Sequence, residues 1–341
     1  MNRIKSMGLL VSILLLLGSC SKEDVMNESS QVINHEVNIS FFEKSIEDLS
    51  TVSDYSSARL HSTRADKATS LPACHRFSEL EVALIPFESE NDSGYVIRQD
   101  SLDENFGKVS FDIPAGSYHM VAIAAKTEMP FTDRISIKSI SEARFANNKV
   151  TDMVYAYKDI IVSSEQSNQS FDASLTRGVS AFKLFSSIKT PVNVASETIE
   201  LTGGCGVVFN PSTGKCKSEE TVSYSVILPQ KSKFYNVFFT VYTLLSDDDV
   251  ENIHAKSQAK DKNGKVIKEC NFTDVHLVKG KQTCYEGNFF DNTSSSSFTV
   301  SNASLDDSGF SKHVEKVLNS PLPTLGTVSY HGWALSLMND A

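Results

Sequence analysis

The residues best placed for chemistry lie at the start of the chain and end at a cysteine. Arg3 and Lys5 precede a short apolar run over residues 7–17, and the segment closes with Leu17-Gly18-Ser19-Cys20. This run is too short to cross about 30 Å of hydrocarbon, whereas its flanks match a secretory signal. Cleavage before Cys20 leaves a thiol and an amine that accept acyl chains such as palmitate. The pattern predicts a bacterial lipoprotein signal peptide over residues 1–19 and lipidation of Cys20; an ordinary signal with an incidental cysteine is the alternative.

Five of the six cysteines follow in an exported chain, where disulfides can form. Cys205 and Cys216 flank the turn-like stretch Asn210–Gly214 and are expected to face each other across a hairpin. We therefore predict that this pair is bonded or close enough to bond. Cys270 and Cys284 are a second, less symmetrical pair. The odd count leaves one of the five without a partner in the chain.

No metal or catalytic motif is present in the sequence. There is no C-x-x-C pair, and the eight histidines are scattered without ligand spacing. The chain also lacks G-x-S-x-G, H-E-x-x-H and a glycine-rich phosphate loop. The glycine cluster Thr202–Gly206 is not followed by a helical pattern, so it favours a bulge or a tight bend. We expect no enzymatic activity, no metal and no cofactor.

The charge of the chain excludes one class of partner. The formal net charge is −10, and it becomes −12 when Arg3 and Lys5 leave with the signal peptide. Phosphate backbones and anionic headgroups are repelled by such a chain rather than attracted to it. We therefore expect no nucleic-acid partner.

The length and composition indicate two cores made of β-sheet. A chain of 341 residues is long for a single core even without its signal peptide. Its 20 Phe and 10 Tyr against one Trp, together with many Ser, Thr and Val residues, suit half-buried pleated surfaces better than helices.

The first predicted strand of the chain follows a polar tether. Residues 20–34 lack apolar periodicity, so we expect a flexible, lipidated linker. The next residues alternate polar and apolar, which places Val37, Ile39 and Phe41 on one face of a first strand. The stretch 43–70 is polar and has no apolar rhythm, which predicts an exposed loop.

Several strand-like runs follow in the first half. Residues 80–87 predict a strand that ends near a proline, and residues 109–113 and 118–125 predict a hairpin around Pro114–Ser117. Further strand-like runs cover 95–97, 153–162 and 171–185. A domain boundary is expected near 172–178.

The second half repeats the pattern of strands and turns, as antiparallel sandwiches do. Its expected strands cover 198–208, 221–228, 235–245, 266–270, 275–278 and 283–289. Within 235–245, the nearly continuous bulky residues 237–242 predict a strand covered on both faces. Apolar residues at helical spacing from Phe310 to Leu318, followed by Pro321, predict one short helix. The tail over residues 325–338 again has the composition of an extended, strand-like segment.

Together these features resemble the fimbrillin-like subunits of type V pili, which Gram-negative gut and oral anaerobes make as lipoproteins. The features that carry the resemblance are the lipobox at Cys20, the strand Val37–Phe41, the loop with Thr63-Arg64-Ala65, and the segments Phe77–Leu84, Ile113–Tyr118 and Leu175–Ala181.

The resemblance implies the fold and the mode of assembly. It implies an all-β chain with two tandem transthyretin-like antiparallel β-sandwich domains, over 35–174 and 175–341, the short C-terminal helix lying in the second. Subunits of this kind join into a pilus by donor-strand exchange, after an arginine-specific protease removes the first strand. Arg64 is then the candidate cleavage site, or else a plain surface arginine. Val37, Ile39 and Phe41 would line the displaced strand, and the tail is either the donor or a core strand.

The implied function is a structural or adhesive subunit of a cell-surface fimbrium. Its partners are other pilus subunits, the outer membrane through the lipid on Cys20, and a host or bacterial surface ligand for adhesion. The alternative is an outer-membrane lipoprotein that binds glycan or another nutrient. That alternative needs flat aromatic surfaces for sugar rings, and Trp333 is the only tryptophan.

Overall fold

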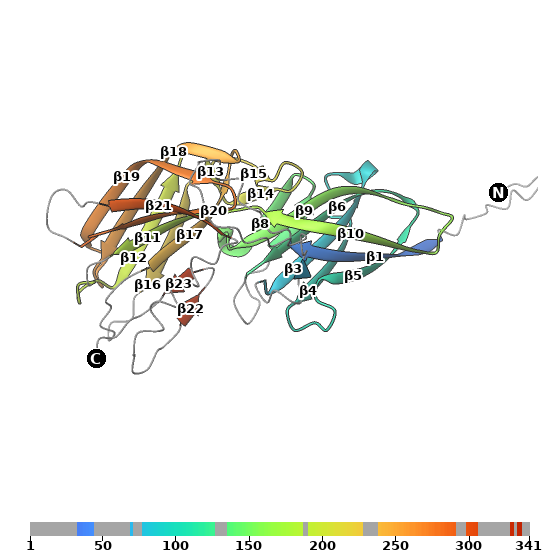
Figure 1. The fold of residues 1–341 in the computed structure, drawn as a ribbon, viewed down its shortest axis with the longest axis horizontal. Helices are drawn as coiled ribbons and strands as arrows, with labels where there is room; N and C mark the ends of the chain where they lie inside the picture. Colours follow the sequence, from blue (N-terminus) through green and yellow to red (C-terminus); the bar gives the residue numbers. More distant parts are fainter. Residues whose placement is uncertain are drawn as a thin grey trace, which may run out of the picture. The chain divides into compact units, whose positions relative to one another are not determined.

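The computed structural model describes residues 33–43, 69–70, 77–126, 135–186, 190–227, 238–290, 298–305, 328–330 and 333–335. Over these ranges the protein is all-β, with several mainly antiparallel sheets in a sandwich-like arrangement (Figure 1). Short 3₁₀ turns occur at η1 (Phe87–Ser89) and η2 (Ala146–Asn148). The predicted fold class is confirmed, while the expected helix over 310–318 lies outside the described residues.

The first half of the chain forms two layers of strands. One layer contains β1 (Asn34–Glu43), β2 (Thr69–Ser70), β5 (Lys108–Pro114) and most of β10 (Asn168–Arg177). The other contains β9 (Met153–Val162), β6 (Gly116–Ala125), β3 (Glu79–Pro86) and β4 (Tyr95–Asp100), in that spatial order. The last two residues of β10 pair with β9, so β10 passes from one layer to the other.

A hydrophobic cluster fills the space between these layers because every second residue of each strand faces inward. The first layer contributes Val37, Ile39, Phe41, Phe111 and Ile113, and the second contributes Leu80, Val82, Leu84, Met120 and Ala122. The predicted first strand is thus confirmed as β1, and its apolar residues lie in the core.

The predicted hairpin over 109–125 is wrong in its pairing. Both strands exist, as β5 and β6, but β5 pairs with β1 whereas β6 pairs with β3 and β9. Only Ala115 separates β5 from β6. The chain turns there from one layer into the other, which lets both strands bury apolar side chains in the same cluster.

The second half contains two further sheets. One has the order β13 (Cys205–Gly206), β17 (Phe238–Leu245), β11 (Ser180–Ser186), β20 (Lys281–Gly287) and β21 (Phe298–Ser304). The other has the order β16 (Val222–Ile227), β12 (Ser196–Thr202), β18 (Asp249–Lys260) and β19 (Val266–Val278). In β17, Thr240, Val241, Thr243 and Leu244 are all buried, so this part of the strand is covered on both faces as predicted. A short hairpin, β22 (Val328–Tyr330) and β23 (Trp333–Leu335), lies in the tail.

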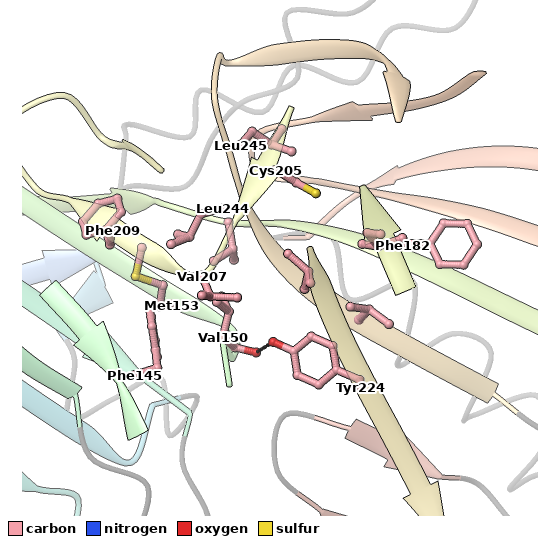
Figure 2. Packing of buried hydrophobic residues seen from close by; sticks show 14 of the residues in the cluster. Phe145, Val150, Met153, Phe182, Cys205, Val207, Phe209, Tyr224, Leu244 and Leu245 are labelled. Carbon is pink, nitrogen blue, oxygen red and sulfur yellow. Dashed lines mark hydrogen bonds between the residues drawn. The ribbon is translucent and has the colours of Figure 1, made fainter. Parts of the chain in front are cut away.

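A small sheet contains strands from both halves of the sequence. Its order is β15 (Lys215–Cys216), β14 (Val208–Asn210), β8 (Glu142–Phe145) and β7 (Ile135–Ser139). Residues of both halves also share one hydrophobic cluster, in which Phe145, Val150 and Met153 lie near Val207, Phe209 and Leu244 (Figure 2). The proposed boundary between 174 and 175 falls within β10, and the division into two domains stays a prediction.

Candidate strand-exchange site

Strand β1 occupies a position between β5 and β10, which we call the β1 slot (Figure 1). Residues Asn34–Ser40 pair antiparallel with β5, and residues Glu36–Glu43 pair in parallel with β10. Both backbone edges of β1 are therefore used. Among the described residues β5 has no strand partner other than β1, so without β1 both β5 and the paired part of β10 have an open hydrogen-bonding edge.

The inward face of β1 is completely buried. Val37, Ile39 and Phe41 have relative exposures of 0%, 1% and 1%. Burying a side chain of this kind contributes about 1.5–3 kcal/mol. The three positions predicted for the displaced strand therefore supply much of the driving force that holds β1 in place.

Each inward residue of β1 has defined neighbours in the adjacent strands. Val37 lies opposite Phe111, and Ile39 lies opposite Val109. The backbone N–H of Phe41 donates to the carbonyl of Gly107, 3.0 Å away. On the other side, Val37, Ile39 and Phe41 pair with Gln169, Phe171 and Ala173 of β10.

The outward face of β1 is polar from Glu36 to Ser40 and is linked to its neighbours by hydrogen bonds. The Asn38 amide donates to Glu36 and to the side-chain oxygen of Asn168, both at 3.1 Å. The Asn168 amide donates in turn to Glu36 at 3.2 Å, and the Ser110 hydroxyl donates to Glu36 at 3.4 Å. Exposed bonds of this kind add little stability each, but they favour one register of β1.

The start of β1 is fixed by His35, which is buried. Its Nδ1 lies 2.8 Å from the carbonyl oxygen of Gln166, in the connection between β9 and β10. The Gln169 amide donates to the carbonyls of Ser163 and Gln166, at 3.0 and 3.3 Å, and so closes the same connection. The connection between β9 and β10 therefore holds the end of the slot at which β1 begins.

The remaining predicted site residues fall elsewhere. Cys20 and Arg64 lie outside the described residues, so lipidation and cleavage stay predictions. Sequence reasoning also missed the residues that line the slot, such as Phe111 and Ala173. The alternation within 108–114 marks the inward residues of that strand, but no local signal shows that they flank β1.

Cys205 lies in β13 and Cys216 in β15, both as free thiols. The predicted turn does join β14 to β15, but Cys216 lies opposite Phe209, and the Cys205 carbonyl accepts from the N–H of Glu220. The expectation that the two cysteines face each other is wrong, because this register pairs each with another residue. Burial raises the pKa of Cys205 to about 12 and that of Cys216 to about 11. A disulfide between them stays a prediction.

Within the described ranges, no cluster of three or more His, Cys, Asp or Glu side chains is arranged to hold a metal ion. No helix in those ranges has the length and apolar character needed to span a membrane. The tight bend expected at the glycine cluster is present, since Gly203 and Gly204 have φ of +83° and +68°.

Comparisons with known proteins place the chain in a family. The family model for fimbrillin-A associated anchor proteins Mfa1 and Mfa2 matches residues 81–301. No curated protein matches the chain.

Solved structures also align with the chain. The fimbrial anchor protein Mfa2 from Porphyromonas gingivalis aligns at 11% identity and a TM-score of 0.38, over 80% of this chain and 98% of that one. A fimbrial assembly protein from Parabacteroides distasonis aligns at 11% identity and a TM-score of 0.40, over 79% and 96%. The family match covers well over half of the sequence, and it implies a fimbrial or adhesin-like role at the cell surface, in association with other fimbrial subunits. The chain belongs to the family of fimbrillin-A associated anchor proteins Mfa1 and Mfa2.

Proposed function

We propose that the chain is a structural or adhesive subunit of a cell-surface fimbrium, of the type V pilus kind, that assembles by donor-strand exchange. In this process an extended segment of a neighbouring subunit replaces β1 in the slot between β5 and β10. The observation that carries the proposal is the position of β1, which is paired on both edges and buried on one face although it is the first strand of the described chain.

The order of the strands makes β1 removable by a single cut. The predicted signal and tether lie on the N-terminal side of β1, and the polar stretch 43–70 follows on its C-terminal side. One cleavage within that stretch, before Thr69, separates β1 covalently from every strand with which it pairs, including β2 at Thr69–Ser70. All other strands remain in one piece.

Loss of β1 creates a strong preference for a replacement strand. It opens hydrogen-bonding edges on β5 and β10 and exposes the cluster that Val37, Ile39 and Phe41 cover. Open edges and exposed apolar surface bind extended segments by β-augmentation, in which the backbone gives affinity and alternate side chains fill pockets.

Export and processing complete the proposal. The chain leaves the cell as a lipoprotein with its lipid on Cys20, which holds it at the outer membrane at least until processing. Arg64 is the proposed cleavage site within the polar stretch. Cleavage there releases Cys20 and β1 together, so processing frees the subunit from the membrane and opens the slot in the same step.

Limited digestion with an arginine-specific protease tests this function. We expect cleavage after Arg64, loss of β1 by mass analysis, and conversion of the monomer into ladders of oligomers. The double change Arg59→Lys/Arg64→Lys keeps both charges and removes both arginines of the stretch, so it should stay monomeric, whereas Arg59→Lys alone should behave as the wild type. A chain that loses β1 and remains monomeric at high concentration would overturn assembly by strand exchange.

A further inference from the structure

The inward side chains of β1 increase in size along the strand, from Val37 through Ile39 to Phe41. Their neighbours on the β5 edge decrease in size in the same direction. Phe111 lies opposite Val37, Val109 lies opposite Ile39, and Gly107, the residue just before β5, accepts a backbone hydrogen bond from Phe41. On this edge of the slot the neighbouring residue is therefore largest at Phe111, which we call the narrow end, and smallest at Gly107, which we call the wide end.

The β10 side of the slot widens at the same end. Phe41 pairs with Ala173, whereas Ile39 and Val37 pair with the larger Phe171 and Gln169. Both Phe41 and Ala173 are buried, with relative exposures of 1% and 5%. Small residues on both sides thus make room for one aromatic ring at this end.

Gly107 fixes the wide end. Its φ is +88°, a left-handed conformation that residues with a Cβ adopt only at a cost. A larger residue at position 107 is therefore disfavoured, and the backbone conformation itself keeps the space beside Phe41 open.

We propose that the slot selects its partner strand by the order of side-chain sizes, which deepens the proposed function and rests on it. The partner is an extended segment that runs parallel to β10 and places a small β-branched, a medium β-branched and an aromatic residue at alternate inward positions. A strand with the reverse order forces an aromatic ring against Phe111 and leaves a void beside Ala173. Overpacking and cavities in a close-packed core both weaken binding.

This rule separates two stretches of the chain's own tail. Gly326, Val328 and Tyr330 increase in size at alternate positions, as the residues of β1 do. In Trp333, Leu335 and Leu337 the aromatic residue comes first and two leucines of equal size follow. If a tail of this sequence enters the slot of another copy, the first stretch places its aromatic residue at the wide end, with Gly326 in place of a β-branched residue, whereas the second places its aromatic residue against Phe111.

A competition experiment on the full chain tests the rule. A sequence-specific protease site is placed within residues 50–60, cleavage is completed, and a labelled peptide of residues 35–43 is exchanged into the slot. Two unlabelled competitors are compared, the same peptide and its Val37→Phe/Phe41→Val form, which has identical composition. We expect the swapped peptide to compete at least tenfold more weakly.

Three outcomes are separable. If both peptides compete equally, the size rule is overturned while strand exchange stands. If even the native peptide does not enter the slot, the proposed function fails, and the rule with it. In a Phe111→Ala chain the narrow end is enlarged, so the swapped peptide should compete several-fold more strongly, relative to the native peptide, than it does on the wild-type chain. If its competition does not improve, Phe111 does not cause the discrimination, and the assignment to Phe111 is overturned.

Discussion

The hydroxyl of Tyr224 donates a hydrogen bond to the backbone carbonyl of Val150, 3.1 Å away (Figure 2). Tyr224 is in β16, in the second half of the sequence, whereas Val150 precedes β9 in the first half. The same hydroxyl lies 3.3 Å from the carbonyl of Tyr242. Burial raises the pKa of Tyr224, so the phenol stays protonated and available as a donor. One buried hydroxyl thus links backbone segments far apart in the chain.

Tyr224→Phe should lower the free energy of unfolding by about 1–2 kcal/mol, because it removes the donor and leaves a buried carbonyl without it. Urea unfolding followed by tryptophan fluorescence or circular dichroism measures this. Tyr95→Phe is the matched control, since its side chain is 39% exposed, and it should change stability by less than about 0.5 kcal/mol. Equal effects of the two changes would show that the Val150 bond contributes nothing.

Gly214→Ala should destabilise the protein more than Gly264→Ala. Both glycines have positive φ, +70° and +80°, so both substitutions carry a backbone cost of about 1–2 kcal/mol. A Cβ at Gly214 collides with the Tyr155 hydroxyl, whereas a Cβ at Gly264 meets nothing within 4 Å. The collision should add about 1–3 kcal/mol. Unfolding midpoints of the two variants give the difference, and similar values would mean that Tyr155 moves aside freely.

The strands could be predicted from the sequence more readily than their partners. The alternation of Val37, Ile39 and Phe41 identifies a strand because its period of two depends only on neighbouring residues. Its partner in parallel pairing, β10, begins at Asn168, and nothing local connects the two. Likewise, the composition around Ala115 suggests a hairpin between β5 and β6. These strands do not pair, because they lie in opposite layers, from which Phe111 and Met120 are buried in the same cluster.

Phe41→Ala should lower the free energy of unfolding by about 3–5 kcal/mol, because it leaves a cavity in the core under β1. Phe42→Ala, on the other face of the same strand and only half-buried, should cost much less. Urea unfolding measures both. Phe41→Ala should also speed the release of β1 after cleavage of the following loop, as detected by size exclusion. If the two variants are equally stable, the inward face does not hold β1.

Glu197 is a buried carboxyl on the inward face of β12, with 2% exposure. The Ser257 hydroxyl donates to one of its oxygens at 3.1 Å, and the other oxygen has no hydrogen-bond partner among the described residues. Burial raises its pKa from 4.5 to about 7, with a smaller opposing effect from Ser257. Between these two pH values the folded protein holds a proton that the unfolded chain has released.

Stability should therefore fall as pH rises from about 4.5 to about 7 and stay level above that, since the folded state then bears the full cost of a buried charge. The loss is up to about 3 kcal/mol, because each tenfold difference in proton affinity between the folded and unfolded states corresponds to about 1.4 kcal/mol. Glu197→Gln should remove this slope, because its amide does not titrate. Glu200→Gln, on the partly exposed face of the same strand, should keep it. Urea unfolding at pH 5 and pH 8 for the three chains measures the slopes, and a wild-type slope in Glu197→Gln would assign the pH dependence to another group.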